Sequence, residues 1–545
     1  MNHAGNVGAT EHHDTMSKQA SMRMGDQASM RMSAQASAEK GTLASKRRRR
    51  LGAASALTAL FALAAGCGGA QVQIGKPVAP SSDGTPAAAV PVGEAASRGF
   101  AEALQQMVAH DKASDWSDAS CSSVSKAFLD ASARQRAETK KDLLEALYNA
   151  GLVAQRCGKH ADAKAQYKAV LDADAKFHRA RVQIALYEWH EKGDPALEGV
   201  MAQLKQAVTD AQFQNVEALV NLAMLQMKRN GQGAEEDGSK NDFERAKRNL
   251  QRALAIDDGY QPAFNQLALY YFDTARAKVG AKAAKAKFAT FAKTKRADVQ
   301  QLELAALVCS QAIRKNAAYA PIHNTAGLIQ IELENVNGAV QEFQAAVRLD
   351  PSFFEAQMNY AAVNLSFRGF KSAEDAYRAA LKMRPNDFDA HLGLALALRG
   401  QIDDSNFEKN VAAAQAELDA CKKLAPERAE TYYNEAILTQ EYKAKGGNDA
   451  AVPMLEQAAT IFDLFVQKAA GAAEFADAVK RSKDRAQDIR DTVKFIKEGQ
   501  TAAAIEAARQ EKEREEAQAE AAADGGAPAP SPEAPATPAP APAKP

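Results

Sequence analysis

The sequence predicts an all-α solenoid built from helix-turn-helix repeats, and three observations support this fold class. The composition is 46% hydrophobic but only 6% aromatic. Alanine supplies much of that apolar share, which favours helices that pack through small side chains. Helical patterning continues, with breaks, from about residue 98 to about residue 499. Within it, equivalent residues recur with a period of 34, and periods of this length are typical of solenoids.

Residues 1–66 are expected to be an extension followed by an export signal. A basic cluster, Lys46 to Arg50, precedes the 15-residue apolar run Leu51 to Ala65. This run is too short to span a membrane, and its order matches a secretory signal. The residues before the basic cluster are polar and repeat QASMRM. Translation from Met30 or Met32 would give a signal of ordinary length.

A lone cysteine, Cys67, follows the apolar run in the sequence LAAGC. This stretch resembles the lipobox of bacterial lipoproteins, although Ala64 stands where leucine is commoner. The resemblance implies that Cys67 is lipidated and becomes the first residue of the mature protein. Acyl chains would anchor it at about 0.8 kcal/mol per buried CH₂ group. The alternative is an ordinary signal with a chance cysteine. The residue after the cysteine is Gly68. In well-known sorting systems an aspartate at this position signals retention in the inner membrane. We therefore expect the protein to be attached to the outer membrane, on its periplasmic face.

The chain after Cys67 begins with a tether and a helical cap. Residues 67–95 are rich in glycine, proline, serine and alanine, which is typical of a flexible segment. Residues 96–136 are expected to form capping helices ahead of the repeats.

The clearest repeats are adjacent, and they share a pattern of small, aromatic, small and proline residues. Ala339, Phe343, Ala346 and Pro351 recur 34 residues later as Ala373, Tyr377, Ala380 and Pro385. This pattern resembles the tetratricopeptide repeat (TPR). The resemblance implies a right-handed superhelix of about eight repeats over residues 137–470, with the first helix of each pair lining a groove.

The remaining segments fit around this array. Polar residues 230–241 and the longer stretch 273–298 are expected to be insertions between the two helices of a repeat. Residues 471–499 are expected to form a capping helix and residues 500–524 a charged helix. Residues 525–545 are rich in proline and alanine and are expected to be a disordered tail.

We expect no enzyme activity, cofactor or metal site. The histidines and cysteines form no HExxH or CxxC motif, and the sequence has no phosphate loop or nucleophile elbow. Cys309 and Cys421 fall on core positions of the repeat. A Cys121–Cys157 disulfide is allowed in an oxidising compartment, but the spacing does not indicate it.

One set of polar residues falls at the sixth position of successive first helices. Six of the eight are amides, and a side-chain amide can pair with the backbone of an extended peptide. The resemblance to TPR proteins implies this use, because some of them bind an extended peptide through such a ladder. The alternative is that these side chains join neighbouring helices. The residues are Asn149, Gln183, Asn221, Gln266, Thr325, Asn359, Gly393 and Asn434.

Two further surfaces are candidates for binding. The predicted groove is mostly apolar, which favours a helix or an extended segment over a carboxylate clamp; its residues are Asn324, Leu328, Met358, Ala362, Leu392 and Leu396. A basic strip without acidic residues could contact anionic lipid, glycan or an acidic partner. The alternative is a solvated insertion helix with its alanine and phenylalanine side on the stack. The strip comprises Arg276, Lys278, Lys282, Lys285, Lys287, Lys293, Lys295 and Arg296.

These features predict a non-catalytic scaffold lipoprotein of the cell envelope. The combination of lipobox and TPRs resembles the TPR lipoproteins of the myxobacterial adventurous gliding motility apparatus, and more distantly the pilotins of pilus secretins. The expected partners are envelope proteins in the groove and the membrane through the anchor. Nucleic acid is not expected, because the formal net charge is zero. The alternative is a TPR module that recruits a peptidoglycan or polysaccharide synthase, or that binds wall glycan.

Overall fold

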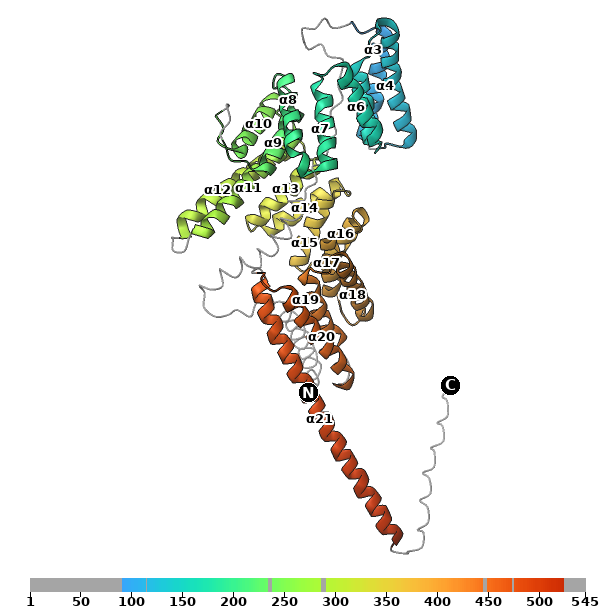
Figure 1. Cartoon of the computed structure of the whole chain (residues 1–545), viewed down its shortest axis with the longest axis vertical. Coiled ribbons are helices and arrows are strands. Elements are labelled where there is room, and N and C mark those ends of the chain that lie inside the picture. Colours follow the sequence, from blue (N-terminus) through green and yellow to red (C-terminus); the bar gives the residue numbers. More distant parts are fainter. Residues whose placement is uncertain are drawn as a thin grey trace, which may run out of the picture. The chain divides into compact units, whose positions relative to one another are not determined.

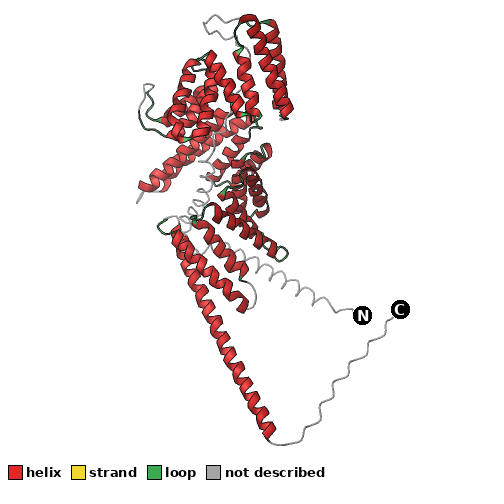
Figure 2. Cartoon of the chain, turned by 45° about the vertical axis from the view of Figure 1, so that its right-hand side comes forward, coloured by secondary structure: helices red, strands yellow, loops and turns green. Residues whose placement is uncertain are grey.

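The computed structural model describes residues 91–113, 115–233, 238–285, 291–444, 448–472 and 475–523. Within these ranges the regular elements are helices and no strand is present, which confirms the all-α prediction (Figures 1 and 2). None of these helices combines the length and apolar character that a membrane span requires. Cys67 and the proline-rich tail lie outside the described residues.

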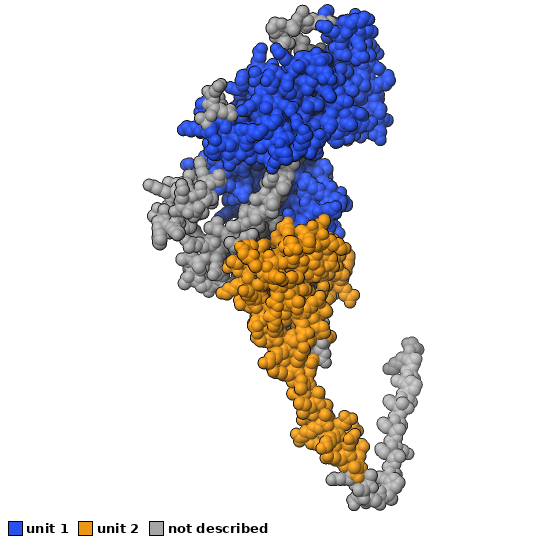
Figure 3. Space-filling view, viewed as in Figure 1, with its two compact units in different colours: residues 1–397 blue, residues 398–545 orange. Residues whose placement is uncertain are grey.

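The chain forms two compact units, residues 1–397 and 398–545, which are described separately (Figure 3). The first begins with the hairpin of α3 (Glu94–Ala113) and α4 (Asp118–Thr139). Helix pairs follow: α5 (Leu144–Arg156) with α6 (His160–Ala173), α7 (His178–Lys192) with α8 (Leu197–Asp210), α9 (Val216–Arg229) with α10 (Asp242–Ile256), α11 (Gln261–Lys285) with α12 (Phe291–Lys315), α13 (Ala320–Glu332) with α14 (Val336–Leu349), and α15 (Phe354–Ser366) with α16 (Phe370–Met383).

Helix α17 (Phe388–Gly400) crosses the boundary between the units. The second unit continues with α18 (Phe407–Leu424) and α19 (Ala429–Leu438), which runs on as a short π-helix, η2 (Thr439–Lys443). Helix α20 (Asn448–Lys468) then packs against α21 (Ala476–Ala523). The predicted C-terminal cap and the charged segment are therefore one continuous helix of 48 residues.

A glycine on the first helix and an aromatic ring on the second set the spacing of two helix pairs. A Cβ atom on Gly151 would lie 2.6 Å from Cε1 of Tyr167, and one on Gly327 would lie 2.5 Å from Cε1 of Phe343. Both rings are fully buried. Because glycine places only a hydrogen at the contact, the ring can fill the space between the helices without displacing either backbone.

A second recurring contact ties the start of a first helix to the turn before it. In four consecutive repeats, the fourth residue of the helix hydrogen-bonds to the carbonyl oxygen six residues earlier. Three different residue types make this bond, so no single residue marks it in the sequence. The pairs are His323 Nε2 with Ala317 O (3.0 Å), Gln357 Nε2 with Pro351 O (3.1 Å), His391 Nε2 with Pro385 O (2.9 Å) and Tyr432 Oη with Pro426 O (2.8 Å).

The first insertion is closed by a buried carboxylate. Asp242, which is fully buried, begins α10. Its carboxylate accepts hydrogen bonds from Arg229 (Nε, 2.7 Å), from Arg245 (Nη2, 2.8 Å) and from the backbone N–H of Gly231 (2.7 Å). Burial alone would raise the pKa of Asp242, but these hydrogen bonds outweigh it and hold the pKa at about 2. One side chain therefore holds both ends of the inserted loop.

The second insertion, residues 273–298, is helical where the structure describes it. Helix α11 continues into it as far as Lys285, and α12 already begins at Phe291. The inserted residues are rich in alanine and lysine, which have high helix propensity. They therefore lengthen both helices of the pair.

A disulfide joins Cys121 to Cys157, and this corrects the sequence expectation. The two cysteines are 36 residues apart, a spacing that carried no signal. Helix α4 packs against α5, however, and this brings the first turn of α4 to the C-cap of α5. Beside the bridge, Nε of Arg156 donates to Asp111 at 2.6 Å. The N-terminal hairpin is thus covalently attached to the first repeat.

Replacing Gly327 with alanine should destabilise the protein, because the new Cβ would overlap the buried Phe343 ring. Overpacking costs about 1–3 kcal/mol, which exceeds the gain of about 1 kcal/mol in helix propensity. Gly199→Ala is the matched control, since its Cβ would meet nothing within 4 Å in α8. Chemical denaturation should show a lower unfolding free energy for Gly327→Ala and an unchanged or higher one for Gly199→Ala. Equal values would contradict the close contact.

Asp242→Asn should lower the unfolding free energy by about 3 kcal/mol, because Arg229 and Arg245 would lose their shared buried counter-charge. The folded-state pKa lies below the unfolded value of about 4, so this stabilisation is present above pH 4 and disappears as the pH falls towards 2. The difference between wild type and variant should shrink over that window. Asp130→Asn, which breaks an exposed pair with Lys126, should change stability by less than about 1 kcal/mol. A pH-independent difference for Asp242→Asn would contradict the assignment.

Candidate functional site

The predicted amide ladder occupies one register in the structure. Each of its residues is the sixth residue of the first helix of a pair. Most are buried: Asn149 and Gln183 are 0% exposed, Asn359 is 1% and Asn221 and Thr325 are 2% exposed. Gln266 and Asn434 are half-buried.

Two ladder amides of the first unit bond to the neighbouring first helix, whereas Nδ2 of Asn221 donates to the Glu217 carbonyl within α9. Nε2 of Gln183 on α7 donates to the Glu217 carboxylate on α9 at 2.7 Å. Nδ2 of Asn359 on α15 donates to Oδ1 of Asn324 on α13 at 2.9 Å. The side-chain oxygens of Gln183 and Asn359 are also out of contact with solvent. Neither amide therefore has an edge directed at a groove.

Two further contacts repeat this arrangement. The hydroxyl of Thr325 on α13 donates to Oδ1 of Asn265 on α11 at 2.6 Å. In the second unit, the guanidinium of Arg399 at the end of α17 donates to Oδ1 of Asn434 on α19 at 3.1 Å. Four junctions between consecutive first helices are thus bridged by the ladder register. This arrangement favours the alternative in which the ladder holds helices together.

Sequence patterning did not reveal two partners in these bridges, Glu217 and Arg399. Each sits on a first helix like its neighbours, Glu217 as the second residue of α9 and Arg399 near the end of α17. Arg399 is only 9% exposed. They occupy different registers, the second and the twelfth residue of their helices, so the repeat pattern gives no signal for them.

The groove candidates lie at the fifth and ninth residues of the first helices, immediately before the ladder position and about one turn after it. Unlike most ladder side chains, they keep a small exposed area, about 5–8% for five of them, and Leu396 is half-buried. Leu328 and Ala362 also belong to the hydrophobic core of the first unit, and Asn324 is the partner of Asn359. The narrow exposed edge that these residues leave along α13, α15 and α17 is the candidate protein-binding site of the first unit, and we call it the apolar surface; its residues are Asn324, Leu328, Met358, Ala362, Leu392 and Leu396.

The basic strip can be followed only in part. Arg276 on α11 lies 3.7 Å from Glu332 and stacks over the Phe272 ring. Lys287 and the side chains of the other six strip residues lie outside the described part of the structure, as does Cys67. In the described residues no three histidine, cysteine or acidic side chains are grouped so that they could hold a metal ion.

Two segments of the chain match the family model of the tetratricopeptide repeat, residues 144–177 and 320–353. They contain the α5–α6 and α13–α14 pairs, which are the pairs with the glycine–aromatic contact. No protein with a curated description matches the chain.

Several solved structures resemble the chain. A thermophilic TPR protein of Thermus thermophilus is 22% identical, with a TM-score of 0.32 over 41% of this chain and 99% of that chain. The pilF protein of Pseudomonas aeruginosa is 17% identical, with a TM-score of 0.32 over 49% of this chain and 97% of that chain. YrrB, a TPR protein with an unusual peptide-binding site, is 16% identical, with a TM-score of 0.29 over 43% of this chain and 97% of that chain. The family-model matches and the helix-pair geometry show that this chain carries tetratricopeptide repeats arranged as an α-solenoid.

Proposed function

We propose that this chain is an exported, lipid-anchored scaffold that gathers proteins of a cell-envelope machine. Its repeats indicate a protein–protein interaction scaffold. The single observation that carries the export proposal is the disulfide between Cys121 and Cys157. Disulfides persist in oxidising compartments and are rare in the cytosol. A bond that attaches the N-terminal hairpin to the first repeat is therefore best explained by folding outside the cytoplasm.

The sequence around Cys67 supports the anchor. It supplies a basic cluster, a short apolar run and small residues before the cysteine, in the order of a lipoprotein signal. The two cysteines free of disulfides in the described structure, Cys309 and Cys421, are buried. Lipidation of Cys67 would leave the four internal cysteines as one disulfide and two buried thiols. We place the anchored protein at the periplasmic face of the outer membrane.

The surface proposed to hold partners is the apolar one on α13, α15 and α17. An apolar edge along parallel first helices is suited to an amphipathic helix or an extended segment. No group of catalytic residues has been identified there, so the proposed role is to position other proteins. A gliding motility apparatus or a pilus or secretion assembly is the proposed machine, on the resemblance of the lipobox and repeats.

Thiol counting and membrane fractionation test export. In the mature protein, an alkylating reagent under denaturing, non-reducing conditions should modify Cys309 and Cys421, while Cys121 and Cys157 should react only after reduction. Cys67→Ser should release the protein from the membrane fraction. Cys309→Ser is the control and should leave it membrane-bound. Reaction of all four internal cysteines without reductant would contradict the compartment, and membrane retention of Cys67→Ser would contradict the anchor.

Site-specific photo-crosslinking tests the binding surface. A photoreactive residue at Leu392 should crosslink to partner proteins in intact cells, because this position lies on the apolar surface. The same residue at Asp375, exposed on α16, should give a different or weaker pattern. Motility or secretion components among the Leu392 adducts would support the proposal. Synthases, or sedimentation of the protein with purified wall, would instead support the alternative role, and identical patterns at both positions would contradict the surface.

A further inference from the structure

Half of α21 extends beyond the helix that packs against it. Its first half buries Ala486, Ile489 and Val493 against α20. From Lys497 to Ala519 every residue is exposed. Ile505 keeps 66% of its surface exposed. Isolated helices are marginal in water and are usually stabilised by packing, so this length of helix has an unused face.

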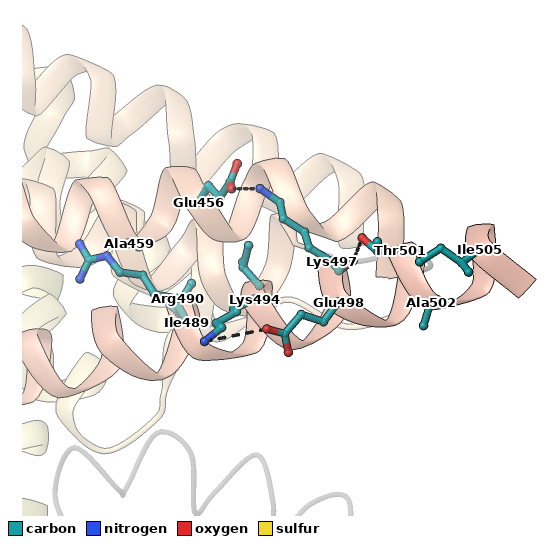
Figure 4. A pocket seen from close by; sticks show the side chains of 11 residues that line it. Glu456, Ala459, Ile489, Arg490, Lys494, Lys497, Glu498, Thr501, Ala502 and Ile505 are labelled. Atoms are coloured by element: carbon teal, nitrogen blue, oxygen red, sulfur yellow. Dashed lines mark hydrogen bonds and ion pairs between the residues drawn. The ribbon is translucent and has the colours of Figure 1, made fainter.

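An open groove lies where the exposed part of α21 begins. It has a volume of about 670 Å³. Figure 4 shows the side chains that line it, among them Lys494, Glu498, Ala502 and Ile505 of α21 and Ala459 of α20. Ile489 and Val493 add apolar surface to its wall. The groove therefore combines an aliphatic floor with charged side chains on its rim.

Two ion pairs lie symmetrically about Ile505 along the same helix. On one side, Lys494 and Glu498 approach to 3.9 Å; on the other, Lys512 and Glu516 approach to 3.5 Å. The members of each pair lie 7 and 11 residues from Ile505. Residues separated by 7 and 11 share one face of a helix. This face therefore reads, in order, Lys, Glu, Ile, Lys, Glu.

We propose that this face binds a second copy of the chain, with the two α21 helices antiparallel and Ile505 beside Ile505 at the two-fold axis. In this arrangement Lys494 of one copy meets Glu516 of the other, and Glu498 meets Lys512. The same patch thus serves both partners, as an isologous interface requires. A parallel arrangement in register would set Lys494 against Lys494, and like charges would repel.

The opposed stretches follow from the position of the axis. With Ile505 at the two-fold axis, residues 487–498 of one copy lie along residues 512–523 of the other. The first stretch carries three basic and three acidic side chains and the second carries two basic and four acidic ones, so the orientation rests on the individual pairs of Lys494 with Glu516 and of Glu498 with Lys512. Small residues on either side of Ile505, Ala502 and Ala508, allow the two backbones to approach closely.

Cysteine crosslinking tests the two-fold centre. The full chain is used with Cys67→Ser, so that no lipid and no native exposed cysteine interferes. Ile505→Cys should form a disulfide-linked dimer under mild oxidation, because the two copies of residue 505 meet. Phe495→Cys is the matched control: this position is 78% exposed on the same helix but lies away from its own copy in the pairing. Equal crosslinking at both positions would overturn the proposed centre.

A charge swap tests the orientation by light scattering or sedimentation. The Cys67→Ser chain should be a concentration-dependent dimer that weakens at high salt. Lys494→Glu should weaken dimerisation about tenfold, because the substitution acts twice across the symmetric interface. Adding Glu516→Lys in the same chain should restore it. A monomer at every concentration, or a double variant no better than Lys494→Glu alone, would overturn the proposal.

Discussion

The close contact between a small residue on one helix and a buried ring on the next is the constraint on which the array depends. Gly327 against Phe343 and Gly151 against Tyr167 show it in the two repeats that match the family model. The ring fills the space between helices only because no Cβ occupies it. Since each repeat packs mainly on its neighbours, this local geometry can be preserved while long insertions enter elsewhere. The loop before Asp242 is such a case, because its two ends meet at one buried carboxylate.

The ladder register changes how the binding surface is understood. A side-chain amide that is buried against the next first helix is closed off from a peptide backbone in the groove. Gln183 and Asn359 are in this position. The proposed partner surface is then the edge of the apolar row represented by Leu328, Met358 and Leu392. Apolar contacts are non-directional, so partner choice at this surface would depend on shape and on charged residues around it.

Local pattern explains what the sequence could predict. The 34-residue period, the helix pairs and the sixth-residue register are all repeated in short stretches, and the structure places each ladder residue in that register. The missed features join residues that only the tertiary structure brings together. Cys121 meets Cys157 because α4 packs on α5, and Gln183 meets Glu217 across a repeat. The hydrogen bond from the fourth residue of a first helix to the preceding turn is made by histidine, glutamine or tyrosine, so no single residue type predicts it. The helical form of the second insertion was readable from its alanine and lysine content.

Export, anchoring and self-association would reinforce one another in this chain. Acyl chains on Cys67 would bind one copy to the membrane in proportion to the CH₂ groups that they bury. A dimer through α21 would carry two copies of Cys67 and thus twice the lipid. The second anchor would then bind from a high effective concentration, which raises residence on the membrane without any new contact. The same dimer would double the number of apolar binding surfaces. A partner with two matching segments would therefore be held by avidity.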